Sequence, residues 1–234
     1  MENKQAVIIA FAGEKGGTSK STLATNFVVM AARHGKNVVL LDADQQETAS
    51  NWAELRSGLD GVDIIPCVQG SGNIVNAIQG LATQCDMLVI DVRGQAIDEA
   101  GLATVELASI LATAHLICSP VRPSIDLWTL PRISELTERA RSQVNKKLKT
   151  CVVYTQVSTN IHASDIKNAK DMINQNPVRF GGLEFLDHVQ IGSRTAYQAA
   201  MLAGLGVVEL SDKTKAKKAV QEMKILYREL LKHV

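Results

Sequence analysis

The sequence predicts an α/β domain built on a doubly wound, mostly parallel sheet with helices on both faces. Short apolar runs alternate with longer helical stretches along the 234 residues, which is the chain order of repeated βα units. Aromatic residues make up only 4% of a chain that is 46% hydrophobic, so Val, Ile, Leu and Ala must fill the core. That composition suits strands that are covered on both faces. No repeat or linker composition interrupts the pattern, and we expect residues 1–234 to form one domain.

The expected elements follow in order. Apolar runs predict strands at residues 6–11, 37–41, 62–67, 87–90, 114–118 and 151–154. Helices are predicted between these runs at residues 20–33, 47–56, 73–82, 98–111 and 125–144, and the tail 220–234 has apolar residues at helical spacing. The first helix is expected to end at His34-Gly35, because glycine is favoured just past a helix C-terminus.

The bulk composition restricts where the protein works and what it binds. The formal net charge is +1, so any nucleic-acid binding must come from a local basic patch. Cys67, Cys85, Cys118 and Cys151 are widely separated, which indicates buried thiols in a reducing compartment rather than a metal or disulfide framework. The apolar run before Gly13 is too short for a signal peptide or a membrane span, so we expect a cytoplasmic protein.

A glycine-rich loop follows the first predicted strand and opens the first predicted helix. It contains Lys15, Gly16, Gly17, Thr18, Ser19, Lys20, Ser21 and Thr22. In that position backbone N–H groups and the positive end of the helix dipole converge on phosphate oxygens. The order of glycines, lysine and hydroxyls therefore predicts an ATP site, with Lys20 on the β- and γ-phosphates and Ser21 on Mg²⁺. A flexible glycine turn with incidental lysines is the alternative, and the strand–helix context disfavours it.

Lys15 distinguishes this loop from the ordinary Walker A motif, which has glycines where this sequence has Glu14 and Ser19. The loop resembles the deviant Walker A motif KGGxGK[ST] of the ParA/MinD family. The resemblance implies a P-loop NTPase fold and an ATP-bound homodimer in which Lys15 reaches the partner subunit's nucleotide. Ser19 departs from the motif, and a serine is strained there if the position needs a positive φ.

Two other predicted strands end in carboxylates, at the sheet edge where ligands bind in open α/β folds. Asp42 and Asp44 match the family pattern DxDPQ, with Gln45 in place of the proline. The resemblance implies that Asp44 orients or activates the attacking water and that Asp42 supports the magnesium shell. Asp91 ends an apolar run in the form of a Walker B strand, and we expect it to complete the magnesium site with Ser21. The Arg93-Gly94 pair that follows matches a DxRG variant seen in some partition ATPases.

Two further segments have weaker assignments. Residues 120–124 resemble the family's PxxPS loop, although the residues alone predict only a rigid loop capped by Ser124. Trp52 follows the acidic segment as in small plasmid-partition ATPases, and we favour a core anchor over a functional role for it. The adenine pocket is not assigned from the sequence.

Three kinds of function are compatible with such an ATPase: DNA segregation, MinD-like positioning on a membrane, and metabolic or redox chemistry. The cysteines are not placed to ligate an iron–sulfur cluster between subunits, which disfavours the redox class. The apolar stripe of residues 220–234 lacks Trp and Phe, so we expect it to pack on the sheet rather than enter a membrane.

Basic residues favour DNA segregation. The candidates for DNA contact are Arg194, Lys215, Lys217 and Lys218, and a second basic stretch spans residues 132–149. Together with the resemblance, they imply a small ParA-type partition ATPase that forms a Mg²⁺–ATP sandwich dimer, hydrolyses ATP slowly and binds nucleoid DNA without sequence preference. A centromere-binding ParB-type partner is expected to stimulate hydrolysis, and no stable membrane association is expected. The alternative is a MinD-like ATPase that positions a protein complex on a membrane or nucleoid surface.

Overall fold

The computed structural model describes residues 6–94, 96–97, 101–123, 126–160 and 164–234, and within them one sheet of seven strands organises the chain. The strands are β1 (Val7–Phe11), β2 (Val38–Ala43), β3 (Cys67–Gln69), β4 (Met87–Val92), β5 (Leu116–Val121), β6 (Lys149–Val157) and β7 (Glu184–Gly192). Their order across the sheet is β3-β2-β4-β1-β5-β6-β7, and every pairing between these strands is parallel. The predicted doubly wound sheet is therefore confirmed.

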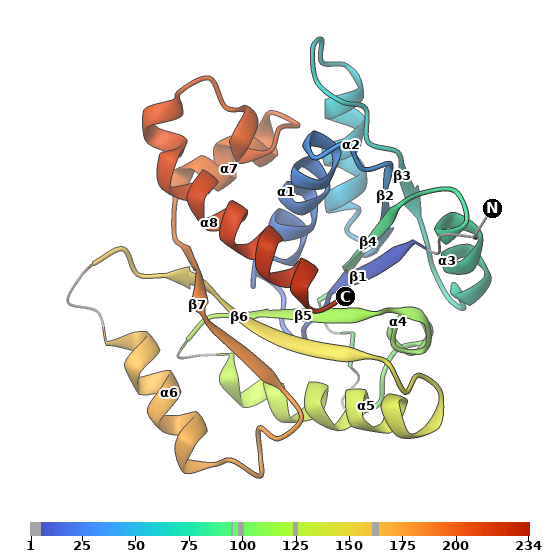
Figure 1. The fold of residues 1–234 in the computed structure, drawn as a ribbon, viewed down its shortest axis with the longest axis vertical. Helices are drawn as coiled ribbons and strands as arrows, with labels where there is room; N and C mark the ends of the chain where they lie inside the picture. Colours follow the sequence, from blue (N-terminus) through green and yellow to red (C-terminus); the bar gives the residue numbers. More distant parts are fainter. Residues whose placement is uncertain (1–5, 95, 98–100, 124–125, 161–163) are drawn as a thin grey trace.

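Helices cover both faces of this sheet. They are α1 (Lys20–Arg33), α2 (Thr48–Ser57), α3 (Val75–Ala82), α4 (Val105–Thr113), α5 (Leu130–Gln143), α6 (Asp165–Gln175), α7 (Thr195–Leu202) and α8 (Lys213–Lys232), with single 3₁₀ turns η1 (Leu127–Thr129) and η2 (Val207–Glu209). Figure 1 shows α1, α7 and α8 on one side of the sheet and α5 and α6 on the other. A hydrophobic core lies on each face of the sheet, and alternate residues of the central strands contribute to one or the other. In β1, Ile9 and Phe11 face α1 and α8, while Ile8 and Ala10 face α3 and α4.

Several predicted boundaries were wrong for local reasons. The strand expected at 62–67 is replaced by β3, because the chain before Pro66 runs along the surface and leaves Ile64 75% exposed. Within the described residues, the helix expected at 98–111 begins later, as α4. Thr104 caps it by accepting a hydrogen bond from the backbone N–H of Leu107. The helix expected at 125–144 divides into η1 and α5. Residues 98–100, Ser124 and Ile125 lie outside the described residues.

Other expectations about the covering helices are confirmed. Helix α1 ends at Arg33, and Gly35 follows with a φ of 73°. The apolar stripe of the tail packs inside the molecule, since Met223, Leu226 and Leu230 on α8 are completely buried. Trp52 is a core anchor: it is 1% exposed, and its indole N–H donates to the carbonyl of Leu205 at 3.2 Å.

Arg56 forms a buried connection that could not be foreseen from the sequence. It is 1% exposed and forms a two-pronged ion pair with Glu209 at 2.7 and 2.8 Å. It also donates to the carbonyls of Asp63 and Gly204, and its guanidinium lies 5.4 Å from the ring centre of Trp52. Helix α2 is thus fixed to the turn η2, far along the chain.

Candidate functional site: a phosphate loop at the carboxyl edge of the sheet

The glycine-rich loop joins the central strand β1 to α1, where it can accept an anion. Gly17 and Ser19 both have left-handed backbones, with φ of 74° and 72°. The strain expected for a serine at position 19 is therefore present. Gly16 and Gly17 are exposed, whereas Thr18 is 2% exposed and anchors the loop to the body of the protein. This conformation exposes the glycine backbone to an incoming phosphate.

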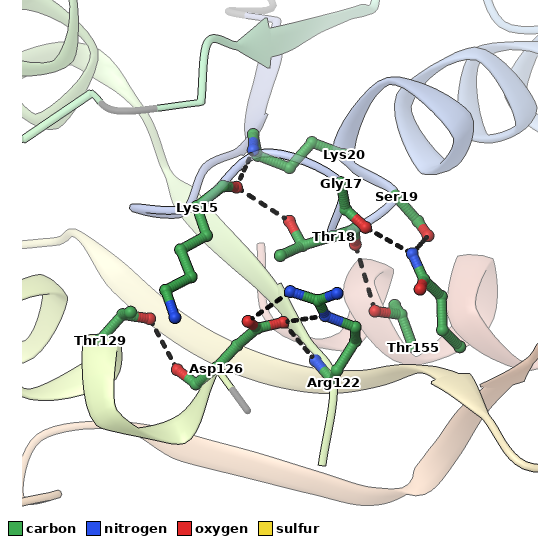
Figure 2. A network of polar contacts seen from close by, with 10 residues as sticks. Lys15, Gly17, Thr18, Ser19, Lys20, Arg122, Asp126, Thr129 and Thr155 are labelled. Atoms are coloured by element: carbon green, nitrogen blue, oxygen red, sulfur yellow. Dashed lines mark hydrogen bonds and ion pairs between the residues drawn. The ribbon is translucent and has the colours of Figure 1, made fainter. Parts of the chain in front are cut away.

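Lys20 lies beneath this loop with its charge largely withdrawn from solvent. The residue is 6% exposed, and its ammonium donates to the backbone carbonyl of Lys15 at 2.7 Å (Figure 2). Burial lowers the pKa of Lys20, and the nearby carboxylates of Asp91, Asp44 and Asp126 oppose that shift. A phosphate oxygen is a stronger acceptor than this carbonyl, so the buried ammonium is well placed to bind one.

The two acidic strand ends meet beside the loop because β2 and β4 are neighbours. Their register pairs Asp42 with Asp91 across the sheet. The Asp42 carboxylate already accepts three hydrogen bonds, from the backbone N–H and hydroxyl of Ser50 at 2.8 Å each and from the N–H of Asp44 at 3.0 Å. These contacts shape the loop that carries Asp44 to the edge of the cavity.

Asp91 has the properties expected of a cation ligand. It is completely buried, and by distance and angle neither of its oxygens has a hydrogen-bond partner among the described residues. Burial and the nearby Asp42 raise the pKa of Asp91 to about 7, although the Ser21 hydroxyl and the Lys20 ammonium act to lower it. An unpaired buried charge is costly, so such a group is expected to be matched by a bound ion.

These residues fit magnesium. Among the described residues, no three His, Cys, Asp or Glu side chains are grouped as a complete metal cage. Mg²⁺ commonly takes only one or two protein ligands and completes its shell with water and substrate phosphates. The buried Asp91 and the Ser21 hydroxyl beside it match that requirement. Asp42 already accepts hydrogen bonds from Ser50 and Asp44, and its part in the magnesium shell stays a prediction.

Lys15 does not point into the phosphate site in this single chain. Figure 2 shows its side chain extended toward Asp126 and Thr129 of its own subunit. Asp126 is completely buried, and Arg122 holds it through its side chain at 2.8 and 2.9 Å and through its backbone N–H at 3.0 Å. Burial opposes the charge on Asp126, but Arg122 and, to a lesser extent, Lys15 outweigh it and lower the pKa of the carboxyl. The segment after Pro120 thus supplies a carboxylate that faces Lys15.

A cavity of about 910 Å³ opens beside the phosphate loop. Its walls come from the loop and the start of α1, residues 44–48, Arg93 and Gly94, Gln156, and the segment from Ile191 to Leu202. A β-carbon at Gly94 would lie 3.0 Å from the backbone of Gly16, so a larger residue there requires the phosphate loop to shift. The last segment, which runs from the end of β7 through α7, provides a wall that was not assigned from the sequence.

The four residues predicted to contact DNA are in two different places. Arg194 lies on the cavity wall, and its guanidinium donates twice to Glu222 of α8, at 2.8 and 2.6 Å. Lys215, Lys217 and Lys218 are exposed at the start of α8, where Lys215 forms an ion pair with Asp212 at 3.3 Å. The structure therefore does not bring Arg194 together with the lysines, although α8 connects them.

The second basic stretch, residues 132–149, is partly neutralised. Arg132 pairs with Glu14 at 2.7 Å, Arg139 pairs with Glu135 at 3.4 Å, and Arg141 pairs with Glu138. Glu14, which replaces a Walker A glycine, therefore has a structural partner on α5. Each of these three arginines therefore has an acidic neighbour that offsets its charge.

Comparison with known proteins decides the family. The model of the CobQ/CobB/MinD/ParA nucleotide binding domain matches residues 9–207. The chain belongs to this family. The resemblance seen in the phosphate loop is confirmed.

Relatives that match most of the chain support the same assignment. Maintenance of carboxysome distribution protein A of Halothiobacillus neapolitanus is 24% identical over 232 residues, which cover 99% of each chain. Protein ParA of Rhizobium radiobacter is 24% identical over 198 residues, which cover 84% of this chain and 83% of that protein. The ATP complex of a Cyanothece McdA variant has a TM-score of 0.66 at 15% identity and covers 94% of this chain and 96% of that one. The structural likeness shows that this family member has the ParA/MinD type of P-loop fold.

Proposed function

We propose that this ParA/MinD-type ATPase is a DNA segregation or positioning switch, which forms a Mg²⁺–ATP sandwich homodimer and binds DNA without sequence preference. One observation carries the proposal: the phosphate-loop cavity is connected to a lysine-rich surface. Arg194 on the cavity wall is bonded to Glu222, and Glu222 belongs to the helix that begins with Lys213, Lys215, Lys217 and Lys218. Through this helix, nucleotide in the cavity can influence contacts at the surface.

The residues of the cavity have separate roles in the proposed hydrolysis of ATP. The backbone of residues 16–22 and the Lys20 ammonium bind the phosphates of ATP, and Ser21 and Asp91 hold the metal. Magnesium, when bound, neutralises phosphate charge and aligns the terminal phosphate. Asp44 orients the attacking water, since its carboxylate is held at the cavity by the backbone N–H of Gln46 at 3.0 Å. Hydrolysis is slow without a partner because the single chain directs Lys15 away from the γ-phosphate, which then lacks a second cation.

Lys15 supplies that second cation in the proposed dimer. In the single chain its ammonium lies toward Asp126, so it must leave this carboxylate to reach the nucleotide of the partner subunit. ATP, which has one more phosphate than ADP, favours that exchange. The nucleotide therefore controls dimer formation through the difference in its affinity for the two states.

The lysines of α8 support a DNA-binding role on physical grounds. Cations at the N-terminus of a helix are unfavourable, because they face the positive end of the helix dipole. This helix nevertheless has four lysines in its first six residues, Lys213–Lys218, and Asp212 caps it by accepting from the N–H of Lys215. An external polyanion such as the DNA backbone compensates that unfavourable placement.

The setting of this activity is part of the proposal. The relatives are named for plasmid partition and for carboxysome distribution. We infer a cytoplasmic, nucleoid-associated protein whose ATPase is stimulated by a ParB-type or cargo-bound partner. No helix in the described part of the chain is long and apolar enough to span a membrane. A MinD-like role on a membrane is disfavoured by α8, because its apolar face is buried in the core.

The test is binding of a non-specific DNA duplex with Mg²⁺ and either ATP or ADP, across a range of salt concentrations. We expect ATP-dependent binding that weakens with salt. Lys217→Ala with Lys218→Ala should reduce the slope of log affinity against log salt by about one for each DNA phosphate that is no longer neutralised. Lys36→Ala with Lys167→Ala removes the same charge from two exposed positions outside both basic stretches and is the matched control. Absence of binding by the wild-type protein with ATP contradicts the DNA-binding proposal and directs attention to protein or membrane surfaces.

A further inference from the structure

The end of strand β6 holds the phosphate loop from its outer side. The Thr155 hydroxyl donates to the carbonyl of Thr18 at 3.1 Å, and both the donor and the acceptor are buried (Figure 2). The next residue, Gln156, uses its side-chain amide to donate to the carbonyl of Gly17 and to the hydroxyl of Ser19, the latter at 3.3 Å. Two residues of β6 therefore contact three consecutive residues of the loop.

These contacts matter because of how a loop binds phosphate. The backbone N–H groups of the loop converge on the anion only if the carbonyl groups of the same peptides point away from it. A carbonyl group that is turned away from the anion into the protein needs a donor of its own, since a buried carbonyl without a partner is unfavourable. Thr155 supplies that donor for the buried Thr18, and Gln156 fixes the orientation of the Gly17 carbonyl at the exposed side of the loop.

Gln156 also contacts Ser19, which has a strained backbone. A left-handed backbone is strained for a non-glycine residue, and Ser19 has a φ of 72°. As the N-cap of α1, Ser19 makes no side-chain hydrogen bond to the helix. Its hydroxyl instead accepts from Gln156, which is itself left-handed with a φ of 51°. Strained residues persist where surrounding contacts hold them, and here each of the two strained residues contacts the other.

We propose that Gln156 is a positioning residue for the phosphate loop, and that it compensates for the serine at position 19 by holding it in the left-handed conformation that phosphate binding requires. The inference rests on the proposed function, in which this loop binds the phosphates of ATP. It adds a residue that is 137 positions away from Ser19 in the chain.

A direct contact between Gln156 and the nucleotide is the competing explanation, because Gln156 also lines the cavity. The two explanations differ in what Ser19→Gly does. A glycine adopts the left-handed conformation without strain, so it removes most of the need for Gln156. A direct contact with the base or ribose is independent of residue 19.

The experiment measures dissociation constants of Mg²⁺–ATP and of Mg²⁺–tripolyphosphate for the full chain. The variants are Gln156→Ala, Gln156→Asn, Ser19→Gly and the double change of Ser19→Gly with Gln156→Ala. Gln156→Asn retains a residue type that tolerates a left-handed backbone but shortens the reach of its amide. Gln190→Ala is the matched control, because Gln190 is an exposed residue on the adjacent strand and its amide donates to the carbonyl of Asp187, away from the phosphate loop. Thermal unfolding of each variant verifies that it is folded.

We expect Gln156→Ala to weaken both ligands about fivefold with Ser19 present and at most about twofold with glycine at position 19. Gln156→Asn should resemble Gln156→Ala, and Gln190→Ala should have no effect. An equal loss in both backgrounds, or a loss for ATP but not for tripolyphosphate, overturns the inference while leaving the ATP site intact. Wild-type protein that binds neither ligand overturns the proposed function as well.

Discussion

Replacing Arg56 by methionine tests how firmly the helix after the acidic loop is attached. The substitution removes the guanidinium but retains an apolar stem of similar length. It leaves Glu209, which is 6% exposed, without its ion-pair partner, and it removes the donor for the carbonyls of Asp63 and Gly204. Breaking a buried ion pair by removing one partner costs about 3 to 5 kcal/mol. For a chain of this size that predicts a fall in Tm of roughly 6 to 20 °C.

Chemical and thermal unfolding measure this loss. Adding Glu209→Gln to Arg56→Met should recover much of the stability, because it removes the unpaired charge while a side-chain oxygen still accepts from the N–H of Gly206. The control is Arg139→Met, which breaks a pair whose side chains are 51% and 71% exposed and should cost less than about 1 kcal/mol. If Arg56→Met costs no more than this control, the reasoning is refuted.

The same pair predicts how stability depends on pH. Burial raises the pKa of Glu209, but the hydrogen bonds from Arg56 and from the N–H of Gly206 outweigh burial and lower it below its ordinary value of 4.5. Because the folded-state pKa is lowered, this stabilisation is present above pH 4.5 and is lost as the pH falls through the lowered value. Arg56→Met should therefore weaken the acid dependence of unfolding. An unchanged profile between about pH 5 and the acid transition would contradict the assignment.

The remaining predictions concern the nucleotide site. Lys20→Ala should weaken Mg²⁺–ATP binding by at least about a hundredfold in titration calorimetry, because a buried charge-assisted contact to phosphate is removed. Asp44→Ala should still bind ATP but hydrolyse it about 10²- to 10⁴-fold more slowly and accumulate as dimer in size-exclusion chromatography; a variant that cycles freely would remove Asp44 from catalysis. Gly94→Ala should weaken ATP binding about tenfold, since the new β-carbon lies 3.0 Å from the backbone of Gly16. Gly80→Ala, where the β-carbon meets nothing within 4 Å, is its control and should leave binding unchanged.

The sequence predicted the centre of the fold better than its edge. Strands β1, β2, β4 and β5 are buried along their whole length or nearly so, and their unbroken apolar runs are readable without any neighbour. Strand β7 was missed because it is an edge strand in which buried and exposed residues are mixed, with Asp187 and His188 in its middle. Its place in the sheet depends on its pairing with β6, which no local pattern reveals.

The same division applies to the candidate site. The phosphate loop and the acidic strand ends are local in sequence, so their chemistry could be predicted from short motifs. Gln156 could not be predicted, because its role depends on contacts with residues more than a hundred positions away. For Asp126 the sequence holds one weak indication, the i,i+4 spacing that allows an ion pair with Arg122. Arg194 was placed on a DNA surface by resemblance, and its bond to Glu222 became visible only in three dimensions.

The attachment of α2 has a consequence for the loop that carries Asp44. Asp42 accepts a hydrogen bond from the backbone N–H of Ser50 at the start of the helix. The ion pair between Arg56 and Glu209 fixes the end of the helix. Residues 44–47 are therefore anchored at both ends, and hydrogen bonds from the N–H of Asp44 to Asp42 and from the N–H of Gln46 to Asp44 already order them. Ordering one residue costs about 1 to 2 kcal/mol of conformational entropy, so a loop that is ordered in advance spares the nucleotide that cost. More of the binding energy of ATP is then available to hold the two subunits of the proposed dimer together.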